Sequence, residues 1–157
     1  MALATAPQRA RLSFLLLAAT VLLGLLPAFA ARAQQSPIGL WETISDVDGR
    51  PKGHIRIREV QGELRGTVEE IVDPKKRDDV CDQCSDERHN LRVLGLTILT
   101  GMRPDGDGYA GGSILDPDNG KVYSCKLAVV DGGKHLAVRG FIGFSLLGRT
   151  QTWNRLE

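Results

Sequence analysis

From Gly39 onward, polar and apolar residues alternate with a period near two, and turn residues interrupt the pattern about every ten positions. Ile55 and Ile57 alternate with His54 and Arg56, which gives this segment one apolar and one polar face. No stretch after residue 33 keeps an apolar period of 3.6 residues for three turns, so helices are not expected there. The pattern predicts an all-β fold.

Eight strands are expected, and short connections join all but one pair of successive strands. The expected ranges are 39–46, 53–60, 63–72, 93–102, 108–115, 121–130, 134–141 and 148–156. Asn119-Gly120 is the strongest hairpin signal, because these two residues supply the positive backbone angles of a tight primed turn. Eight sequential strands can close into an antiparallel up-and-down barrel that leaves no exposed edge. The interior of such a barrel holds packed side chains or one small ligand.

The first 33 residues differ in composition from the rest. Arg9 and Arg11 precede an apolar stretch from Leu12 to Ala28, and the A-x-A form that signal peptidase reads follows at 31–33. This order indicates a signal peptide, residues 1–33, that is cut before Gln34. An uncleaved anchor is the alternative, because the apolar stretch just reaches the low end of a spanning helix. After cleavage, residues 34–157 form a single domain that is not membrane-spanning and is periplasmic or secreted.

Composition narrows the class of protein. Removing Arg9, Arg11 and Arg32 with the leader leaves 17 Lys and Arg against 19 acidic residues, a net charge of −2. This balance provides no basic footprint, so no nucleic acid is expected as a partner. An outer-membrane barrel is also disfavoured, because each basic residue on a lipid-facing strand costs about 2–4 kcal/mol near the bilayer midplane. The barrel is therefore expected to be water-soluble, with its apolar face inward.

Both ends of the strand pattern carry tryptophan. Gly39-Leu40-Trp41 opens the first strand and Trp153-Asn154-Arg155 closes the last. This arrangement resembles the lipocalin and fatty-acid-binding superfamily, in which a G-x-W packs under the barrel and an arginine of the last strand lies over the indole. The resemblance implies structural roles for Gly39, Trp41, Trp153 and Arg155. Stacking of guanidinium on indole contributes roughly 0.5–2 kcal/mol.

Longer segments also carry a resemblance. They are Gly39-Leu40-Trp41, Cys81-Asp82-Gln83-Cys84, and the stretches 112–117, 119–125 and 139–153. These segments resemble one bacterial family, the small exported proteins catalogued as domain of unknown function 2147. The resemblance covers essentially all of the mature chain and implies a lipocalin-like (calycin-like) barrel and an envelope location. It implies no reaction, so function has to be argued from residues.

Three cysteines suggest one disulfide and one remaining thiol in an oxidising compartment. Cys81-x-x-Cys84 lies in the hydrophilic segment 73–90, where no helical pattern supports a thioredoxin-type site. A zinc site of Cys81, Cys84, Cys125 and His89 is a second alternative. It is disfavoured because Cys125 and His89, unlike Cys81 and Cys84, are not a closely spaced pair of ligands in the sequence. Spacing leaves the pairing open. Chain entropy favours Cys84 with Cys125, worth roughly 4 kcal/mol, over the small ring of Cys81 with Cys84, if the segment folds back over the sixth strand.

The last expected strand carries polar residues on both faces. Arg149 and Gln151 share a face with Trp153 and enter the barrel if that face points inward. A buried cation needs a partner, which is either a carboxylate of the protein or the polar head of a ligand. Trp41, Tyr123, Arg149 and Gln151 are therefore the candidate ligand-binding residues.

Patterns typical of catalysis are missing. The three histidines, His54, His89 and His135, are scattered among polar neighbours, and no serine stands in a G-x-S-x-G elbow. The acidic segment 116–120 lacks the bidentate glutamate of a calcium loop and is explained as a turn. No catalytic residue, cofactor or metal is expected.

The leading interpretation is a non-catalytic periplasmic binding module that holds a small, partly apolar ligand inside a lipocalin-like barrel. The alternative is an envelope interaction protein with a solid core that docks another envelope protein through its Cys-bearing connection. The six aromatic residues of the mature chain favour this alternative slightly. A third hypothesis is a thiol or zinc site at Cys81-x-x-Cys84. An open interior favours the first, a packed interior the second, and a free thiol pair of low pKa the third.

Overall fold

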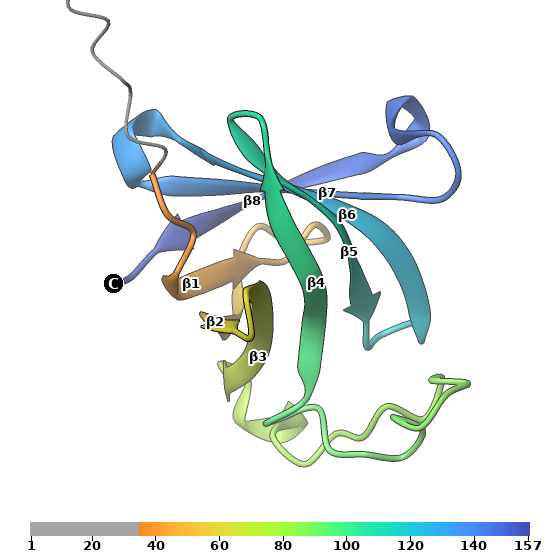
Figure 1. Cartoon of the computed structure of the whole chain (residues 1–157). Coiled ribbons are helices and arrows are strands. Elements are labelled where there is room, and N and C mark those ends of the chain that lie inside the picture. Colours follow the sequence, from red (N-terminus) through yellow and green to blue (C-terminus); the bar gives the residue numbers. More distant parts are fainter. Residues whose placement is uncertain (1–34) are drawn as a thin grey trace, which may run out of the picture. The chain divides into compact units, whose positions relative to one another are not determined.

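Eight antiparallel strands form one sheet whose first and last strands pair with each other, so the sheet closes into a barrel (Figure 1). The computed structural model describes residues 35–157, so the expected signal peptide and its cleavage site lie outside the described residues. Each strand pairs with its neighbours in the sequence, and the closure runs through Trp41 opposite Arg155 and Glu42 opposite Asn154. The expected eight-stranded antiparallel up-and-down barrel is confirmed.

The strands follow the expected ranges within a few residues. They are β1 (Gly39–Ile44), β2 (Pro51–Val60), β3 (Glu63–Ile71), β4 (Thr97–Asp105), β5 (Gly108–Asp116), β6 (Lys121–Val130), β7 (His135–Phe141) and β8 (Arg149–Arg155). Three 3₁₀ turns lie between strands: η1 (Pro74–Lys76), η2 (Asp131–Gly133) and η3 (Ser145–Leu147). None of the helical segments within residues 35–157 has the length and apolar character needed to cross a membrane.

Strand β4 begins four residues later than expected. Residues 93–96 belong to the preceding connection, where Leu96 N donates to Val93 O and Gly95 adopts a φ of +88°. This tight turn ends the connection and delays the start of the strand. The apolar residues at 93, 94 and 96 suggested an earlier start because the turn that interrupts them leaves little trace in the alternation.

The connection between β5 and β6 differs from the expected primed turn. Four residues, 117–120, join Asp116 to its cross-strand partner Lys121, and only Gly120 of the Asn119-Gly120 pair has a positive φ. The Asp116 carboxylate accepts from Asp118 N and from Asn119 Nδ2, and Asn119 Oδ1 accepts from Lys121 N. Hydrogen bonds from the side chains therefore form the longer turn, as the turn chemistry of this segment predicted.

Alternating side chains fill the barrel. Along β2, Gly53, Ile55 and Ile57 are buried, whereas His54 and Arg56 between them face outward and form ion pairs. Glycine is required where strands approach closely inside, since a Cβ on Gly66 of β3 would lie only 2.9 Å from Leu99 Cβ of β4. The apolar face thus points inward, as expected.

The end of the barrel that holds the start of β1 and the end of β8 is called here the closed end. Trp41 is fully buried, and the Arg155 guanidinium lies 4.1 Å from its ring centroid. Trp41 Nε1 donates to Pro37 O at 2.7 Å, which draws the N-terminal segment under the barrel. The expected stack of Arg155 on Trp41 is confirmed.

The opposite end is called here the mouth. Because successive strands are antiparallel, the connections β1–β2, β3–β4, β5–β6 and β7–β8 all emerge there. They comprise residues 45–50, 72–96, 117–120 and 142–148. The mouth therefore carries the longest connection, residues 72–96 (Figure 1). This connection contains Cys81 and Cys84.

Candidate functional site

The inward face of β8 carries polar residues toward the mouth. Cross-strand partners share a face, and Trp153 lies opposite Leu136 while Gln151 lies opposite Val138. Leu136 and Val138 are buried in the core, so Gln151 also points into the barrel. Gln151 is only partly buried, whereas Trp153, two residues deeper, is almost fully buried. Water thus reaches the inward face near Gln151 and not near Trp153.

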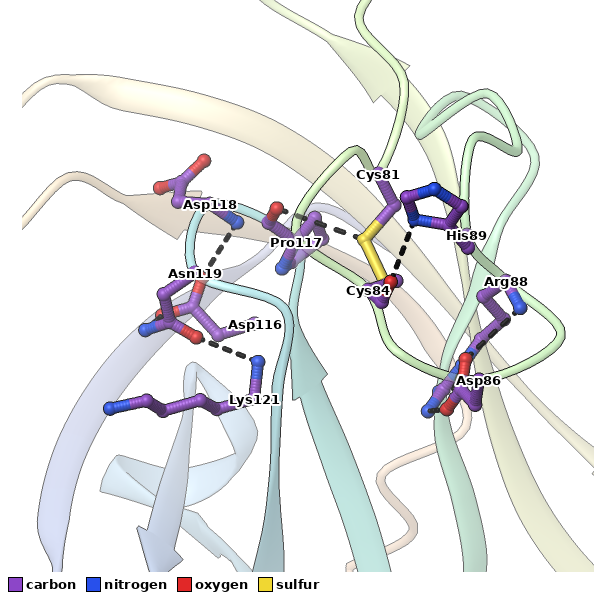
Figure 2. Close-up of a disulfide and its surroundings, with 10 residues drawn as sticks. All are labelled: Cys81, Cys84, Asp86, Arg88, His89, Asp116, Pro117, Asp118, Asn119 and Lys121. Carbon is purple, nitrogen blue, oxygen red and sulfur yellow. Dashed lines mark hydrogen bonds and ion pairs between the residues drawn. A yellow bond between two sulfur atoms is a disulfide. The ribbon is translucent and has the colours of Figure 1, made fainter.

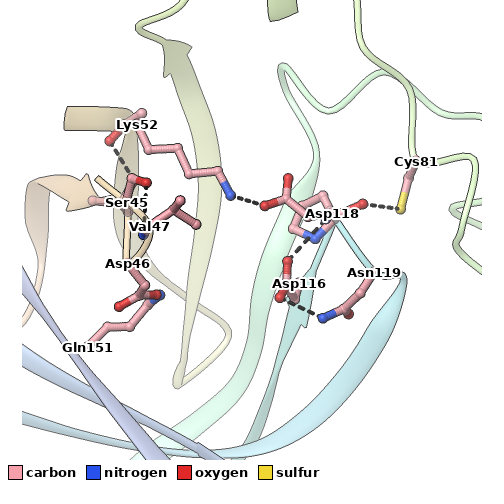
Figure 3. Close-up of polar contacts among 12 residues, drawn as sticks. Ser45, Asp46, Val47, Lys52, Cys81, Asp116, Asp118, Asn119 and Gln151 are labelled. Carbon is pink, nitrogen blue, oxygen red and sulfur yellow. Dashed lines mark hydrogen bonds and ion pairs between the residues drawn. The ribbon is translucent and has the colours of Figure 1, made fainter. Parts of the chain in front are cut away.

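A chain of polar contacts runs from the core to the rim of the mouth. Trp153 Nε1 donates to Gln151 Oε1 at 3.3 Å, and Gln151 Nε2 donates to the Asp46 carboxylate (Figure 3). Asp46, in the β1–β2 connection, also pairs with the Arg149 guanidinium. The indole and the carboxylate together fix the orientation of the Gln151 amide.

Arg149 is not the buried cation that the alternation of β8 predicted. Its side chain is 64% exposed, because it lies at the rim where the strand leaves the barrel. Its partner is the carboxylate of Asp46, so the protein partner, one of the two alternatives for this cation, is the one observed. The sequence gives no sign of Asp46 as a site residue, because the pairing of β1 with β8, which brings the two together, becomes visible only when the barrel closes.

Ile114, Tyr123 and Gly140 form the apolar side of the mouth. Ile114 of β5 lies opposite Tyr123 of β6, and both are partly buried. A Cβ on Gly140 of β7 would lie 3.5 Å from Tyr123 Cβ and 3.8 Å from Ile114 Cγ2, so the three residues share one space. These are ordinary van der Waals separations, so a Cβ at Gly140 would touch Tyr123 and Ile114 without displacing them. We call the group of inward-facing, partly exposed residues Ile114, Tyr123, Gly140 and Gln151 the cup.

Of the four candidate ligand-binding residues, three lie at the mouth and one does not. Tyr123 and Gln151 line the cup, and Arg149 lies at its rim. Trp41 belongs to the closed end, beside Arg155, and Gln151 stands four residues or about 13 Å farther along β8. Trp41 supports the floor of the barrel and is separated from the cup by the buried core.

Cys81 and Cys84 form a disulfide, and Cys125 is a free, buried thiol (Figure 2). One disulfide and one thiol were expected, but the entropic preference for Cys84 with Cys125 was wrong. Cys125 lies on the inward face of β6 between Tyr123 and Leu127, whereas Cys84 belongs to the 72–96 connection. Burial raises the pKa of the Cys125 thiol to about 12. A prediction of the disulfide from loop entropy alone takes no account of where the folded barrel places Cys84 and Cys125.

The connection 72–96 packs against the β5–β6 turn. Cys81 Sγ lies 3.8 Å from Pro117 O, and a Cβ on Gly120 would lie 1.9 Å from Gln83 O. Within the connection, His89 Nδ1 lies 2.8 Å from Cys84 O. Arg88 pairs with Asp86 and lowers the pKa of that carboxyl to about 2 (Figure 2). The long connection is thus ordered by local contacts and covers one side of the mouth.

A second ion pair reaches over the mouth. Lys52, near the start of β2, pairs with Asp118 in the β5–β6 turn (Figure 3). β3 and β4 lie between β2 and β5 in the wall, so this contact does not follow any pair of neighbouring strands. Both side chains are substantially exposed, so water screens the pair and its contribution to stability is small.

The histidines and the cysteine pair that the sequence offered as further candidates make structural contacts within the protein. His54 pairs with Glu70, and His135 pairs with Asp131, each on the outside of the barrel. The sulfurs of Cys81 and Cys84 are bonded to each other, so neither is a thiolate ligand. Residues 35–157 contain no cluster of three or more His, Cys, Asp or Glu side chains arranged to hold a metal ion.

Two surface hollows lie away from the cup. One, of about 630 Å³, lies at the closed end between residues 35–36, 132–134 and 155–157. Its arginine, Arg155, already donates to the carbonyls of Ser36, Ile38, Gly133 and Glu157. The other, of about 320 Å³, lies outside β2 and β3, where Arg56 and Arg58 pair with Glu69. Neither presents an arginine that lacks a partner in the protein.

Comparisons with known proteins agree on fold and family. The family described as "uncharacterized protein conserved in bacteria (DUF2147)" matches residues 39–155. A solved structure, protein HP1028 from the human pathogen Helicobacter pylori, described as belonging to the lipocalin family, superposes with a TM-score of 0.68 at 20% identity. The match covers 78% of this chain and 84% of that chain. No curated protein matches the chain.

Proposed function

Because the chain belongs to the DUF2147 family of uncharacterised bacterial proteins and has a lipocalin-like barrel, we propose that it is a non-catalytic binding protein that holds a small, partly apolar ligand in the cup. The lipocalin-like fold is typically a binding fold. A fold alone does not determine function, so the proposal depends on the residues of the mouth.

The observation that carries the proposal is the change in burial along the inward faces. Toward the closed end, Trp41, Leu136 and Trp153 are almost completely buried. Toward the mouth, Ile114, Tyr123 and Gln151 also face inward but retain contact with solvent. On the side formed by β5, β6 and β8 the inward face is therefore accessible at the mouth, whereas Ile71, Leu96 and Ile98 are buried on the β3–β4 side. The accessible side has the apolar wall and few polar groups that small-molecule sites use.

The residues around the cup suggest the chemistry of the ligand. Ile114, Tyr123 and the vacant side of Gly140 offer apolar contact of limited depth. Gln151 presents an amide that Asp46 and Trp153 hold in place, and Tyr123 presents a hydroxyl that accepts from Asn119 Nδ2 at 3.4 Å. Arg149 at the rim offers a mostly exposed cation whose one partner is Asp46. A short apolar group with a polar or anionic head fits this arrangement, with the head toward the rim.

We place this function outside the cytoplasm, in the periplasm or in the secreted fraction. The leader pattern of residues 1–33 supports export. A disulfide between Cys81 and Cys84 fits an oxidising compartment. N-terminal sequencing of the protein recovered from its own cells tests the location, and a chain that begins at Gln34 is the expected result.

Native mass spectrometry of the protein purified from its own cells tests ligand binding even though the ligand is unidentified. We expect a non-covalent adduct on the wild type that is lost from Gly140→Leu, because the added side chain fills the cup. Thr152→Met is the matched control, since Thr152 neighbours Gln151 on β8 but is exposed on the outer face. An adduct of equal occupancy on all three proteins would place any ligand elsewhere and reject the cup.

A further inference from the structure

The β7–β8 connection, residues 142–148, presents a group of exposed apolar side chains at the mouth. We call it the apolar loop. Ile142, Phe144, Leu146 and Leu147 have between 69% and 89% of their surface exposed. Val47 in the neighbouring β1–β2 connection is also almost fully accessible, and Asp46 beside it contacts Arg149 at the base of the loop. Soluble proteins rarely leave so many large apolar side chains together in water unless the surface binds something.

The backbone of the apolar loop has its own hydrogen-bond donors. Arg139 Nε donates to Ser145 O at 2.8 Å, and Arg139 NH2 donates to Leu146 O at 3.2 Å. Leu147 N donates to Phe144 O and Gly148 N donates to Ser145 O, both at 3.1 Å, within the turn η3. The carbonyls of residues 144–146 can therefore leave water without losing their hydrogen bonds, which lowers the cost of burying this part of the loop in the interface of a bilayer.

The polar groups of the loop distinguish a lipid surface from a protein groove. Ser145 is the only polar side chain between Ile142 and Gly148, and the carbonyls at the tip already have donors. The loop thus offers a protein partner few hydrogen bonds with which to recognise it. A bilayer requires none, because burial of apolar side chains in its interface supplies the free energy of binding.

The charge at the base of the loop matches an anionic headgroup. Arg139 donates to the neutral oxygens of Ser145, Leu146 and Thr150, and none of these contacts neutralises its positive charge. Arg149 follows the loop directly but pairs with the Asp46 carboxylate, so Arg139 supplies the uncompensated cation at the base of the loop. A cation just behind an inserted apolar tip lies at the level of the lipid phosphates.

We propose that the apolar loop docks the barrel, mouth first, onto a phospholipid bilayer that contains anionic lipid, and inserts Phe144, Leu146 and Leu147 among the acyl chains. This docking requires no ligand in the cup. It orients the open end of the barrel toward the lipid surface.

Flotation with lipid vesicles tests the proposal on residues 34–157, which form a compact unit by themselves. We expect the wild type to bind vesicles of phosphatidylglycerol and phosphatidylethanolamine about fivefold more tightly than vesicles of phosphatidylcholine, for one basic residue near the surface. Leu146→Ser combined with Leu147→Ser lowers affinity on the order of 100-fold, about tenfold for each leucine. Val60→Ser combined with Leu156→Ser is the matched control, since both side chains are partly exposed at the closed end, and it binds like the wild type.

A fluorescent reporter measures insertion directly. The native tryptophans, Trp41 and Trp153, are buried, so the added emission of Phe144→Trp comes from the loop. Its emission shifts to the blue on the anionic vesicles and is quenched by brominated acyl chains. The proposal is wrong if the wild type floats with neither vesicle, if the Leu146/Leu147 variant floats as well as the wild type, or if the reporter is not quenched. A dimer in solution that the same variant dissociates would also overturn it, because the loop would then bind a second copy of the chain.

Discussion

Two arginines on the same face of β8 have different roles. Arg155 lies over Trp41, and its guanidinium donates to the carbonyls of Ser36, Ile38, Gly133 and Glu157. Partial burial lowers the pKa of this guanidinium, which remains protonated. Arg149 contacts the single carboxylate of Asp46 and is mostly exposed. The stability of the closed end therefore depends on Arg155, whereas Arg149 contributes little to stability and lies mostly exposed at the mouth.

Replacing each arginine by methionine separates these roles. Arg155→Met removes the stack and several charge-assisted hydrogen bonds, so we expect the free energy of unfolding to fall by about 2–4 kcal/mol. Arg149→Met removes one exposed ion pair and should cost less than about 1 kcal/mol. Urea denaturation measures both. Equal losses for the two variants would contradict the assignment of Arg155 to the floor and Arg149 to the rim.

Cys125 should be inert in the folded protein. Its thiol is buried on the inward face of β6, and burial raises its pKa to about 12, so almost no thiolate exists at neutral pH. Iodoacetamide at pH 8 should modify no thiol in the native protein, one after unfolding, and three after unfolding and reduction. Mass spectrometry counts the modifications. Native modification of two or three thiols would show that the Cys81–Cys84 disulfide is absent.

The same burial predicts a loss of stability in alkaline solution. The unfolded thiol ionises near its ordinary pKa of about 9, whereas the folded thiol remains protonated until about pH 12. The unfolded state therefore binds fewer protons between these values, and the free energy of unfolding declines as pH rises from 9 to 12. Cys125→Ala should remove this part of the decline. An unchanged slope would mean that Cys125 is more accessible than its position indicates.

At the scale of the elements, contact with the β5–β6 turn decides how the 72–96 connection is held. The disulfide closes only a short ring within that connection, worth about 2 kcal/mol by loop entropy against about 4 kcal/mol for the longer pairing with Cys125. Its two sulfurs are nevertheless buried, and Gly120 allows Gln83 to approach closely. The disulfide shapes the connection, and packing on the turn fixes its place.

Two glycine substitutions measure this packing. Gly120 and Gly62 both have a positive φ, so alanine at either position costs about 1–2 kcal/mol through the backbone. Only at Gly120 does the added methyl collide with Gln83, because no atom lies within 4 Å of the corresponding position at Gly62. We expect Gly120→Ala to lose more stability in urea and to speed amide exchange across residues 79–93. Equal effects of the two variants would show that the connection is not held by the turn.

The elements were predictable from the sequence because each depends on local alternation. Eight strands and their order follow from period-two patterns and turn residues, and the start of β4 was missed only where a turn at Gly95 interrupts an apolar run. The stack of Arg155 on Trp41 was expected because the first and last strands resemble those of lipocalins, in which an arginine of the last strand lies over the tryptophan of the first. The ion pair of Asp46 with Arg149 and the exposure of Arg149 depend on where β1 meets β8 in space. The Cys81–Cys84 pairing depends on where the fold places the three cysteines. Alternation along one strand contains neither kind of information.

At the scale of the whole molecule, the two ends of the barrel differ in how completely their residues are buried. The closed end is packed around Trp41 and Trp153, and these two side chains are the largest of the buried apolar core that stabilises the fold. The mouth holds the partly exposed inward residues, the disulfide-bearing connection and the apolar loop. Changes at the mouth are therefore expected to alter binding more than stability, and changes at the closed end the reverse.

The central claim is that the inward face is open at the mouth, and cysteine accessibility along β7 tests it most directly. Gly140→Cys and Val138→Cys point into the barrel at successive inward positions, and Cys125→Ala in both proteins prevents a bond to the neighbouring strand, where Cys125 lies opposite Gly140. We predict that methyl methanethiosulfonate modifies Gly140→Cys rapidly in the folded protein and leaves Val138→Cys unmodified until unfolding. If Gly140→Cys is as unreactive as Val138→Cys, the barrel is packed up to its mouth and the cup does not exist.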